Sequence, residues 1–175
     1  MKHNRTTKVY LHPAYEHYGC DHYGNIWSFK RETKKQIKTI TLNVGSGYEM
    51  FTVMCEGEKI SQYASRFCWE CFNGCIIPTG YEIDHKNHIT DQNTKKNLRL
   101  ATPQQNQYNA IKNKNRTSKY KGVRWDKTNK VWKAGIRVMG QWIHAGNYKD
   151  EVEAAKAYNR VAVSVAGCFA LLNEI

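Results

Sequence analysis

Residues 81–110, YEIDHKNHITDQNTKKNLRLATPQQNQYNA, contain side-chain types that together could cleave a phosphodiester bond. Such cleavage needs a base that activates water and a divalent cation that neutralises charge on the phosphate and the leaving oxygen. Asp84 and Asn106 carry oxygens of the kind that Mg²⁺ prefers, and His85 follows Asp84 directly. The segment is therefore either a metal site spread over a strand, a loop and a helix, or a polar loop on a basic protein.

The elements around these residues must bring them together. Side chains alternate between the two faces of a strand, so Asp84 and His85 approach one point only where the strand ends or twists. The polar run KNHITDQNTKKN follows His85 directly, which makes YEIDH and NLRLAT two short strands joined by a loop. Thr102 as N-cap and Pro103 in the first turn predict that a helix carries Asn106.

This segment resembles the HNH motif of nucleases with the ββα-metal fold, particularly the version in phage and intron-encoded homing endonucleases. The match is ordered: Asp-His at a strand end, Asp91 and Asn93 in the loop, then Asn97-Leu98-Arg99, then Asn106 on the following helix. His85 and Asn97 are 12 positions apart, and Asp84 and Asn106 are 22 positions apart, as in that family.

The resemblance implies a role for each matched position. His85 would be the general base, and Asp84 and Asn106 would hold Mg²⁺, for which Mn²⁺ can substitute. Asn97 would orient His85 and brace the loop, and Arg99 would contact DNA. The upstream segments YGCDHYGNIWSF and RFCWECFNG resemble the β-rich part that is commonly fused to these nucleases, so the likeness covers about residues 18–110.

Several alternatives stay open for the site. His88 could replace His85 as the base, and Asn109, one helical turn after Asn106, could replace it as a metal ligand. The site could also be degenerate and inactive. A second Asp-His pair, Asp21-His22, sits in a glycine-flanked turn and is predicted to be structural.

The cysteines of CWECFNGC admit two interpretations. Cys68, Cys71 and Cys75 have zinc-like spacing, but a fourth ligand at partner spacing is missing, so a structural zinc ion is disfavoured. A helix over about residues 60–72 would instead place Cys68 and Cys71 on an apolar stripe. Before it, IKTITLNVGSGYEMFTVM predicts a β-hairpin around VGSG.

The C-terminal part restarts the pattern after the polar run KNKNRTS. Residues 120–148 predict a three-stranded antiparallel sheet, and residues 150–167 predict an amphipathic helix packed on it, with Asp150 as N-cap. Residues 112–137 hold ten Lys or Arg and one acid, which favours a nucleic-acid partner. In VWKAGIRV the odd-numbered positions from Lys133 to Arg137 share the face that would meet DNA.

The same part resembles the plant APETALA/ethylene-response DNA-binding domain, through KGVRW, AGNY, EAAKAYN and the closing LLN. Gly135 stands where that family often has Glu, and His144 where it often has Trp. The resemblance supports Arg124 and Arg137 as DNA contacts. The complete set of residues predicted to bind DNA is Arg99, Lys121, Arg124, Lys133, Arg137, Trp142 and His144.

Composition agrees with a DNA-binding enzyme. The 175 residues carry a formal net charge of +12, and 41% hydrophobic content is enough for a core. The predicted class is α+β: a β-rich segment and HNH module over residues 1–111, a linker over 112–118, and the sheet-and-helix domain over 119–175. No membrane span or signal peptide is expected, which favours an intracellular protein of a phage-infected or bacterial cell.

The predicted function is site-specific, homing-type cleavage of double-stranded DNA by a phosphodiester hydrolase with one divalent metal. A monomer on DNA is favoured over an obligate dimer, because one chain holds one site. The rival hypothesis is a sequence-specific DNA-binding protein or repressor in which the nuclease fold is an inactive scaffold.

Overall fold

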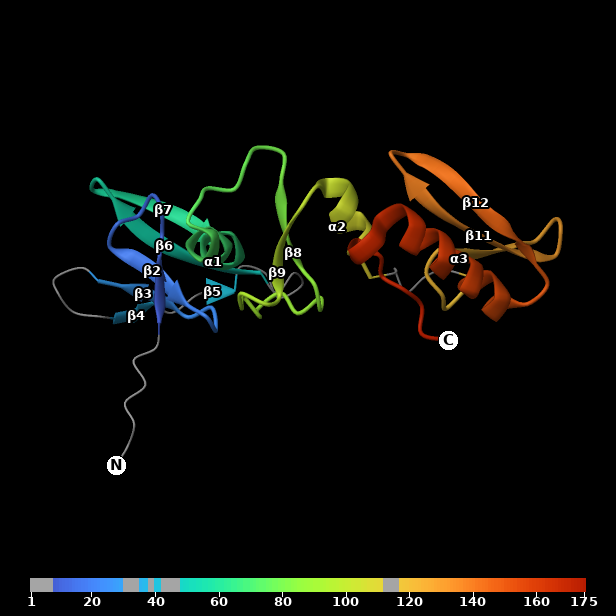
Figure 1. The fold of residues 1–175 in the computed structure, drawn as a ribbon, viewed down its shortest axis with the longest axis horizontal. Helices are drawn as coiled ribbons and strands as arrows, with labels where there is room; N and C mark the ends of the chain where they lie inside the picture. Colours follow the sequence, from blue (N-terminus) through green and yellow to red (C-terminus); the bar gives the residue numbers. More distant parts are fainter. Residues whose placement is uncertain (1–7, 30–34, 38–39, 42–47, 112–116) are drawn as a thin grey trace, which may run out of the picture. The chain divides into compact units, whose positions relative to one another are not determined.

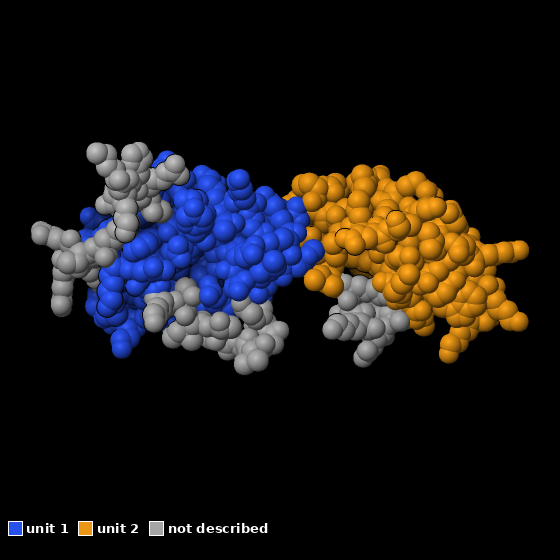
Figure 2. Space-filling view, turned by 90° about the horizontal axis from the view of Figure 1, so that it is seen from below, with its two compact units in different colours: residues 1–101 blue, residues 102–175 orange. Residues whose placement is uncertain are grey.

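A computed structural model describes residues 8–29, 35–37, 40–41, 48–111 and 117–175. The chain forms two compact units, Met1–Ala101 and Thr102–Ile175, which Figure 2 shows in different colours. The helix that follows Thr102 thus groups with the C-terminal unit, whereas the sequence predicts it to be part of the nuclease module. No helix among the described residues is long and apolar enough to cross a membrane. The mixed α/β class is confirmed, since small sheets and helices alternate along the chain.

The N-terminal unit begins with two small antiparallel sheets (Figure 1). The first has the order β1–β2–β3–β4, and the second has the order β5–β6–β7. The strands are β1 (Val9–Leu11), β2 (Tyr18–Asp21), β3 (Ile26–Ser28), β4 (Lys35–Ile37), β5 (Ile40–Thr41), β6 (Glu49–Cys55) and β7 (Glu58–Tyr63). The VGSG segment lies outside the described residues, but β5 and β6, which flank it, do pair antiparallel.

Helix α1 (Ala64–Asn73) begins later than the sequence predicted. Residues 60–63 continue strand β7, because they pair with β6 from Met50↔Tyr63 to Val53↔Ile60. The turn between β6 and β7 uses left-handed backbone at Glu56 (φ 49°) and Gly57 (φ 89°). Tertiary pairing therefore overrides a helical spacing that starts at Ile60.

The apolar face of α1 packs against the two sheets and forms the first core. Cys68 and Cys71 are buried there together with Cys20, as the predicted helical stripe required, whereas Cys75 is exposed. Cysteine on this face behaves as a small apolar side chain.

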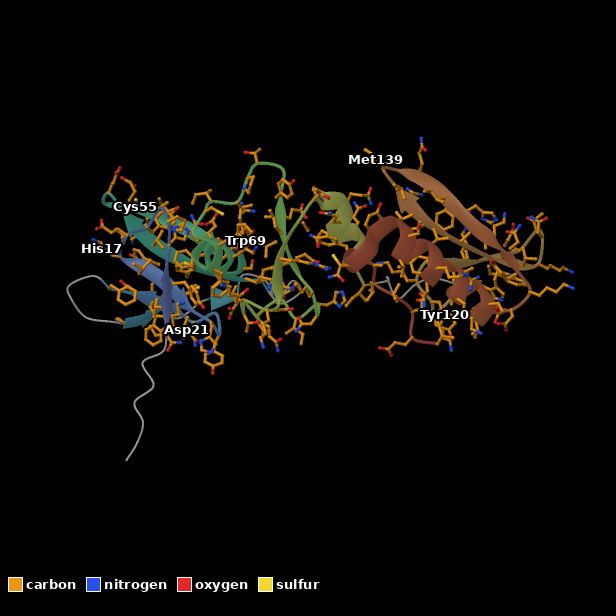
Figure 3. All side chains as sticks on the ribbon, in the orientation of Figure 1. His17, Asp21, Cys55, Trp69, Tyr120 and Met139 are labelled. Atoms are coloured by element: carbon orange, nitrogen blue, oxygen red, sulfur yellow. The ribbon has the colours of Figure 1, made fainter. Side chains whose placement is uncertain are left out.

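The Asp21-His22 pair is structural, as predicted. Asp21, labelled in Figure 3, is 2% exposed and accepts hydrogen bonds from the backbone N–H groups of Tyr23 and Asn25. The Trp27 indole N–H also donates to it at 3.2 Å. These bonds satisfy a buried carboxylate within one turn, so Asp21 holds the link between β2 and β3.

A second hairpin, β8 (Glu82–His85) and β9 (Leu98–Ala101), completes the N-terminal unit. Helix α2 (Pro103–Asn109) then opens the C-terminal unit. Thr102 caps α2 as predicted: its hydroxyl accepts from Gln105 N–H, and the Gln105 side chain accepts from Thr102 N–H.

The C-terminal unit contains one antiparallel sheet with helices beside it (Figure 1). Its strands are β10 (Val123–Asp126), β11 (Val131–Val138) and β12 (Gln141–Tyr148), and they are followed by α3 (Glu151–Ala166) and the 3₁₀ turn η2 (Gly167–Phe169). Asp150 accepts a hydrogen bond from Glu153 N–H and so caps α3 as predicted. Alanines and Tyr158 on α3 pack on β11 and form the second core.

The Tyr158 ring lies directly against the backbone of Gly122. Gly122 has φ 70°, and a Cβ placed on it would lie 2.3 Å from Tyr158 Cε2 and 2.7 Å from the carbonyl oxygen of Gly135. The ring thus occupies the space in which a side chain at residue 122 would stand. The KGVRW motif therefore requires glycine at this position for packing as well as for backbone conformation.

Candidate active site

Strands β8 and β9 place the Asp-His pair at the mouth of a polar loop. The register is Asp84↔Arg99 and His85↔Leu98. Strand β8 ends at His85, and a turn follows in which His88 N–H donates to the His85 carbonyl. Strand β8 thus ends at His85, as the polar run that follows it predicts.

Asp84 is buried and held by the cross-strand partner Arg99. The Arg99 Nε and a terminal guanidinium nitrogen lie 2.7 Å and 2.6 Å from the same oxygen, Asp84 Oδ2. Asp84 is 4% exposed, so this ion pair supplies the positive charge that a buried carboxylate needs. Arg99, predicted as a DNA contact, therefore has an ion-pair partner within the hairpin.

His85 is buried beside Asp84, and its ring meets Asn93. The His85 Nε2 atom lies 3.1 Å from Asn93 Oδ1, and the histidine is 4% exposed. Burial lowers the pKa of His85, and the hydrogen bond to the Asn93 side-chain oxygen and the negative charges of Asp84 and Asp91 only partly oppose this effect. A lowered pKa favours the neutral imidazole, which is the form that can accept a proton.

Asn97 lies in the same loop and bonds to its backbone. Its side-chain oxygen accepts from Asn87 N–H at 3.1 Å, and its side-chain nitrogen donates to the Gln92 carbonyl at 2.8 Å. These two bonds tie the start of the loop to its end. Orientation of the His85 ring, which the family resemblance attributes to Asn97, stays a prediction; the ring contact described above involves Asn93.

Asn106 lies on α2, in the C-terminal unit, and is half-buried. Asn109, the alternative ligand, is on the same helix and is 5% exposed, in a helix turn next to the second core. His88, the alternative base, is half-buried in the loop after β8 with left-handed backbone (φ 63°). A role for Asn106 as a metal ligand stays a prediction.

The second group of predicted residues lies on the sheet of the C-terminal unit. The register pairs Arg124 with Lys133, Arg137 with Trp142, and Gly135 with His144, so one face presents all of them, as predicted. We call this the β10–β12 face. It is a candidate surface for DNA.

An arginine-tryptophan stack occupies the middle of the β10–β12 face. The Arg124 guanidinium carbon lies 4.8 Å from the centroid of the Trp142 ring, which is a cation–π arrangement. A Cβ at Gly135 would lie 2.5 Å from Trp142 Cζ2 and 2.4 Å from the carbonyl oxygen of Ile143. Gly135 thus makes room for the indole, which accounts physically for glycine where the related family often has Glu.

Two of the predicted DNA-binding lysines have partners inside the unit. Lys133 Nζ lies 2.5 Å from Asp126 Oδ2. Lys121 Nζ donates to the carbonyls of Tyr108 at 2.6 Å and Ala110 at 2.5 Å, at the C-terminal end of α2. Burial lowers the pKa of Lys121 to about 8. The geometry therefore gives Lys121 a contact within the fold, whereas Arg124, Arg137 and His144 are exposed.

Two residues at the site were assigned no role from the sequence, although Asn93 belongs to the matched HNH segment. Asn93 is one of several asparagines in a polar loop, and Glu49 is an acid at the start of β6, 44 positions before it. The Asn93 side-chain nitrogen donates to Glu49 Oε2 at 3.2 Å. Only the fold brings these two side chains together beside His85.

Comparison with known proteins points to one family. A family model described as HNH endonuclease matches residues 62–108. An HNH endonuclease of Acanthamoeba polyphaga mimivirus is 40% identical over 99 residues, which are 57% of this chain and 50% of that protein. Protein 3.8 of Escherichia phage T7 is 34% identical over 102 residues, which are 58% of this chain and 83% of that protein. This chain thus spans about half the length of the mimivirus relative.

Among solved structures, one described as "DNA binding and cleavage by the HNH homing endonuclease I-HmuI" is 27% identical. The match has a TM-score of 0.42 and covers 50% of this chain and 48% of that one.

Proposed function

The chain belongs to the HNH endonuclease family, and from that premise we propose that it is a DNA endonuclease in which His85 is the general base. The observation that carries the assignment of His85 is its setting: a buried imidazole with a lowered pKa at the end of β8, directly after Asp84, within the segment that matches the family. A base that is neutral near pH 7 is suited to this task.

The proposed reaction is hydrolysis of a phosphodiester bond. His85 takes a proton from a water molecule, and the oxygen of that water attacks the phosphorus in line. A new oxygen–phosphorus bond forms, and the bond to the 3′ oxygen breaks. The 3′ oxygen leaves with the bonding electron pair and takes a proton from solvent water, while His85 holds the proton of the attacking water as an imidazolium. Asp84, which is fixed across the hairpin by Arg99, keeps a negative charge beside the ring that stabilises this imidazolium.

The donor set fits Mg²⁺ as the proposed cofactor. Among the residues that the structure describes, no group of three or more His, Cys, Asp and Glu side chains is placed to hold a metal ion. The proposed ligands are instead one carboxylate, Asp84, and one amide oxygen, Asn106, and Mg²⁺ commonly takes few protein oxygens and keeps several waters. When bound, the cation would neutralise charge on the phosphate and on the departing oxygen.

Recognition of duplex DNA is proposed for the C-terminal unit. The β10–β12 face exposes Arg124, Arg137 and His144, with the Trp142 ring among them. A two- or three-stranded sheet of this kind can enter the major groove and contact base edges. Together with the likeness to the APETALA/ethylene-response domain, this supports a site-specific enzyme of homing type. One chain carrying one site would nick one strand, and it would act as a monomer on DNA.

The test of the proposal is His85→Ala in the full chain. General base catalysis typically contributes about 10²- to 10⁴-fold, so we expect cleavage to fall by at least about 100-fold while DNA affinity stays nearly unchanged. The substrate is a randomised duplex library with Mg²⁺, cut ends are sequenced, and affinity is measured by gel shift at one salt concentration.

His88→Ala is the matched control, since it removes the neighbouring imidazole from the same loop, and it should cleave like the wild type. Unchanged cleavage by His85→Ala would remove His85 as the base. Tight binding by the wild type without cleavage in Mg²⁺ or Mn²⁺ would instead support a DNA-binding protein with an inactive nuclease scaffold.

A further inference from the structure

A chain of three side chains leads from strand β6 to the imidazole of His85. Glu49 Oε2 accepts a hydrogen bond from Asn93 Nδ2 at 3.2 Å, and Asn93 Oδ1 lies 3.1 Å from His85 Nε2. Glu49 precedes the segment that matches the family model, which begins at residue 62. The β-rich N-terminal segment therefore reaches the candidate base through one intervening amide.

Asn93 is held firmly between these two partners. It is 2% exposed, and its backbone lies against the turn at Gly24, where a Cβ would be 2.6 Å from the Asn93 carbonyl oxygen. Its N–H also donates to the Asp91 carbonyl at 3.1 Å. Because backbone and side chain are both confined, the amide can change its contacts only by rotating about its last bond.

The chemistry of the donors decides which way the amide points. An ionised carboxylate only accepts hydrogen bonds, so Glu49 requires the N–H₂ end of Asn93. The carbonyl end of Asn93 then faces His85 and can only accept, so His85 Nε2 must carry a hydrogen. In a neutral imidazole the other nitrogen, Nδ1, is then the one with a lone pair for a proton.

We propose that Glu49 is a positioning residue of this nuclease, which selects the Nε2–H tautomer of His85 through Asn93 and leaves Nδ1 as the atom that takes the proton from water. The inference rests on the proposed function in one respect, namely that His85 is the base. It extends the active site to β6, so that the β-rich segment positions the His85 ring through Glu49 in addition to packing on α1.

The decisive measurement is the protonation of the two ring nitrogens of His85. In a ¹⁵N-labelled full chain, a long-range ¹H–¹⁵N correlation distinguishes a nitrogen that carries hydrogen from one that carries a lone pair, and the His85→Ala spectrum identifies the signals. We expect Nε2–H in the wild type. Nδ1–H in the wild type would overturn the proposal, and this result needs no variant to fold.

Two substitutions at residue 49 then test whether Glu49 is the cause. Glu49→Gln keeps an oxygen that can accept from Asn93, so it should retain the tautomer and cleave within about tenfold of the wild type. Glu49→Lys can only donate, so it should turn the Asn93 amide around, shift His85 to Nδ1–H, and lower kcat by about 100-fold or more with little change in KM.

Glu56→Lys is the matched control, because it makes the same charge change at an exposed position of the β6–β7 hairpin. It should leave both tautomer and kcat unchanged. If Glu49→Lys keeps Nε2–H, or cleaves like the wild type, Glu49 does not select the tautomer. Persistent cleavage by His85→Ala would refute the proposed base while the tautomer measurement still stood, so the two failures are distinguishable.

Discussion

The positive charge of Lys121 can either bind DNA or stabilise the end of helix α2. The sequence predicts Lys121 as a DNA contact. In the structure its ammonium donates to the carbonyls of Tyr108 and Ala110, and a third carbonyl, that of Gln107, lies at 3.5 Å. These carbonyl groups are at the C-terminal end of α2. The last carbonyls of a helix lack helical partners, and a cation there interacts favourably with the negative end of the helix dipole. Lys121→Met removes the ammonium and keeps a stem of similar length.

The expected loss follows from the two short bonds. Hydrogen bonds from a charged donor contribute about 1.5–3 kcal/mol each, so the gross loss is about 3–6 kcal/mol. Part of this is recovered, because the variant no longer buries an ammonium whose pKa burial lowers to about 8, and because exposed carbonyls can bond to water. We expect a net loss of about 2 kcal/mol, which corresponds to roughly a 30-fold change in an opening equilibrium.

Hydrogen exchange followed by mass spectrometry measures the opening equilibrium of α2 in the full chain. Peptides that cover α2 should lose about 30-fold in protection in Lys121→Met, whereas peptides from α1 should not change. Lys119→Met is the control, since the Lys119 ammonium lies over the Tyr120 ring, 4.9 Å from its centroid. Unchanged protection of α2, combined with weaker DNA binding and a lower salt slope, would refute the capping role and restore Lys121 as a DNA contact.

Two further predictions concern DNA affinity and acid stability. Arg137→Ala, on the exposed β10–β12 face, should weaken DNA binding and reduce the magnitude of the slope of log K against log[salt] by about 1. Arg160→Ala on α3 should change neither the affinity nor the slope. Equal slopes for Arg137→Ala and the wild type would exclude a phosphate contact at Arg137. Burial raises the pKa of Glu70, but hydrogen bonds from His12 and from Ile77 N–H outweigh it, so the net pKa is lowered. Its stabilising effect is therefore present above the unfolded pKa, roughly pH 4–5, and is lost as the pH falls through the folded value. Glu70→Gln should thus be less stable than the wild type at pH 7 and lose less stability on acidification, as measured by urea unfolding; parallel pH curves would contradict this.

The placement of α2 bears on how the chain is organised. Leu171 N–H donates to the Tyr108 carbonyl, Tyr108 belongs to the second core, and the Gln104 side chain accepts from Met139 N–H. The helix that carries Asn106 is thus built into the unit proposed to recognise DNA. The boundary between the two compact units thus lies before α2, whereas the sequence predicts a linker over residues 112–118.

Much of the site could be predicted from the sequence because its signals are local. The caps of α2 and α3, at Thr102 and Asp150, depend on residues three positions apart, and both were predicted correctly. Strand β8 ends at His85 because a polar run follows it. Alternation along β11 also assigned Lys133 and Arg137 to one face, since the side-chain period of a strand does not depend on its partners.

Long-range contacts were decided only by the tertiary structure. The spacing of apolar residues predicts that the helix includes residues 60–63. These residues are instead in strand β7, because their backbone groups bond to the neighbouring strand β6. The links from Glu49 to Asn93 and from Lys121 to the end of α2 join residues that no periodicity relates. The amino-acid sequence by itself thus determined which groups are available for chemistry, and the packing of distant segments decided which nitrogen, carbonyl or carboxylate each of them faces.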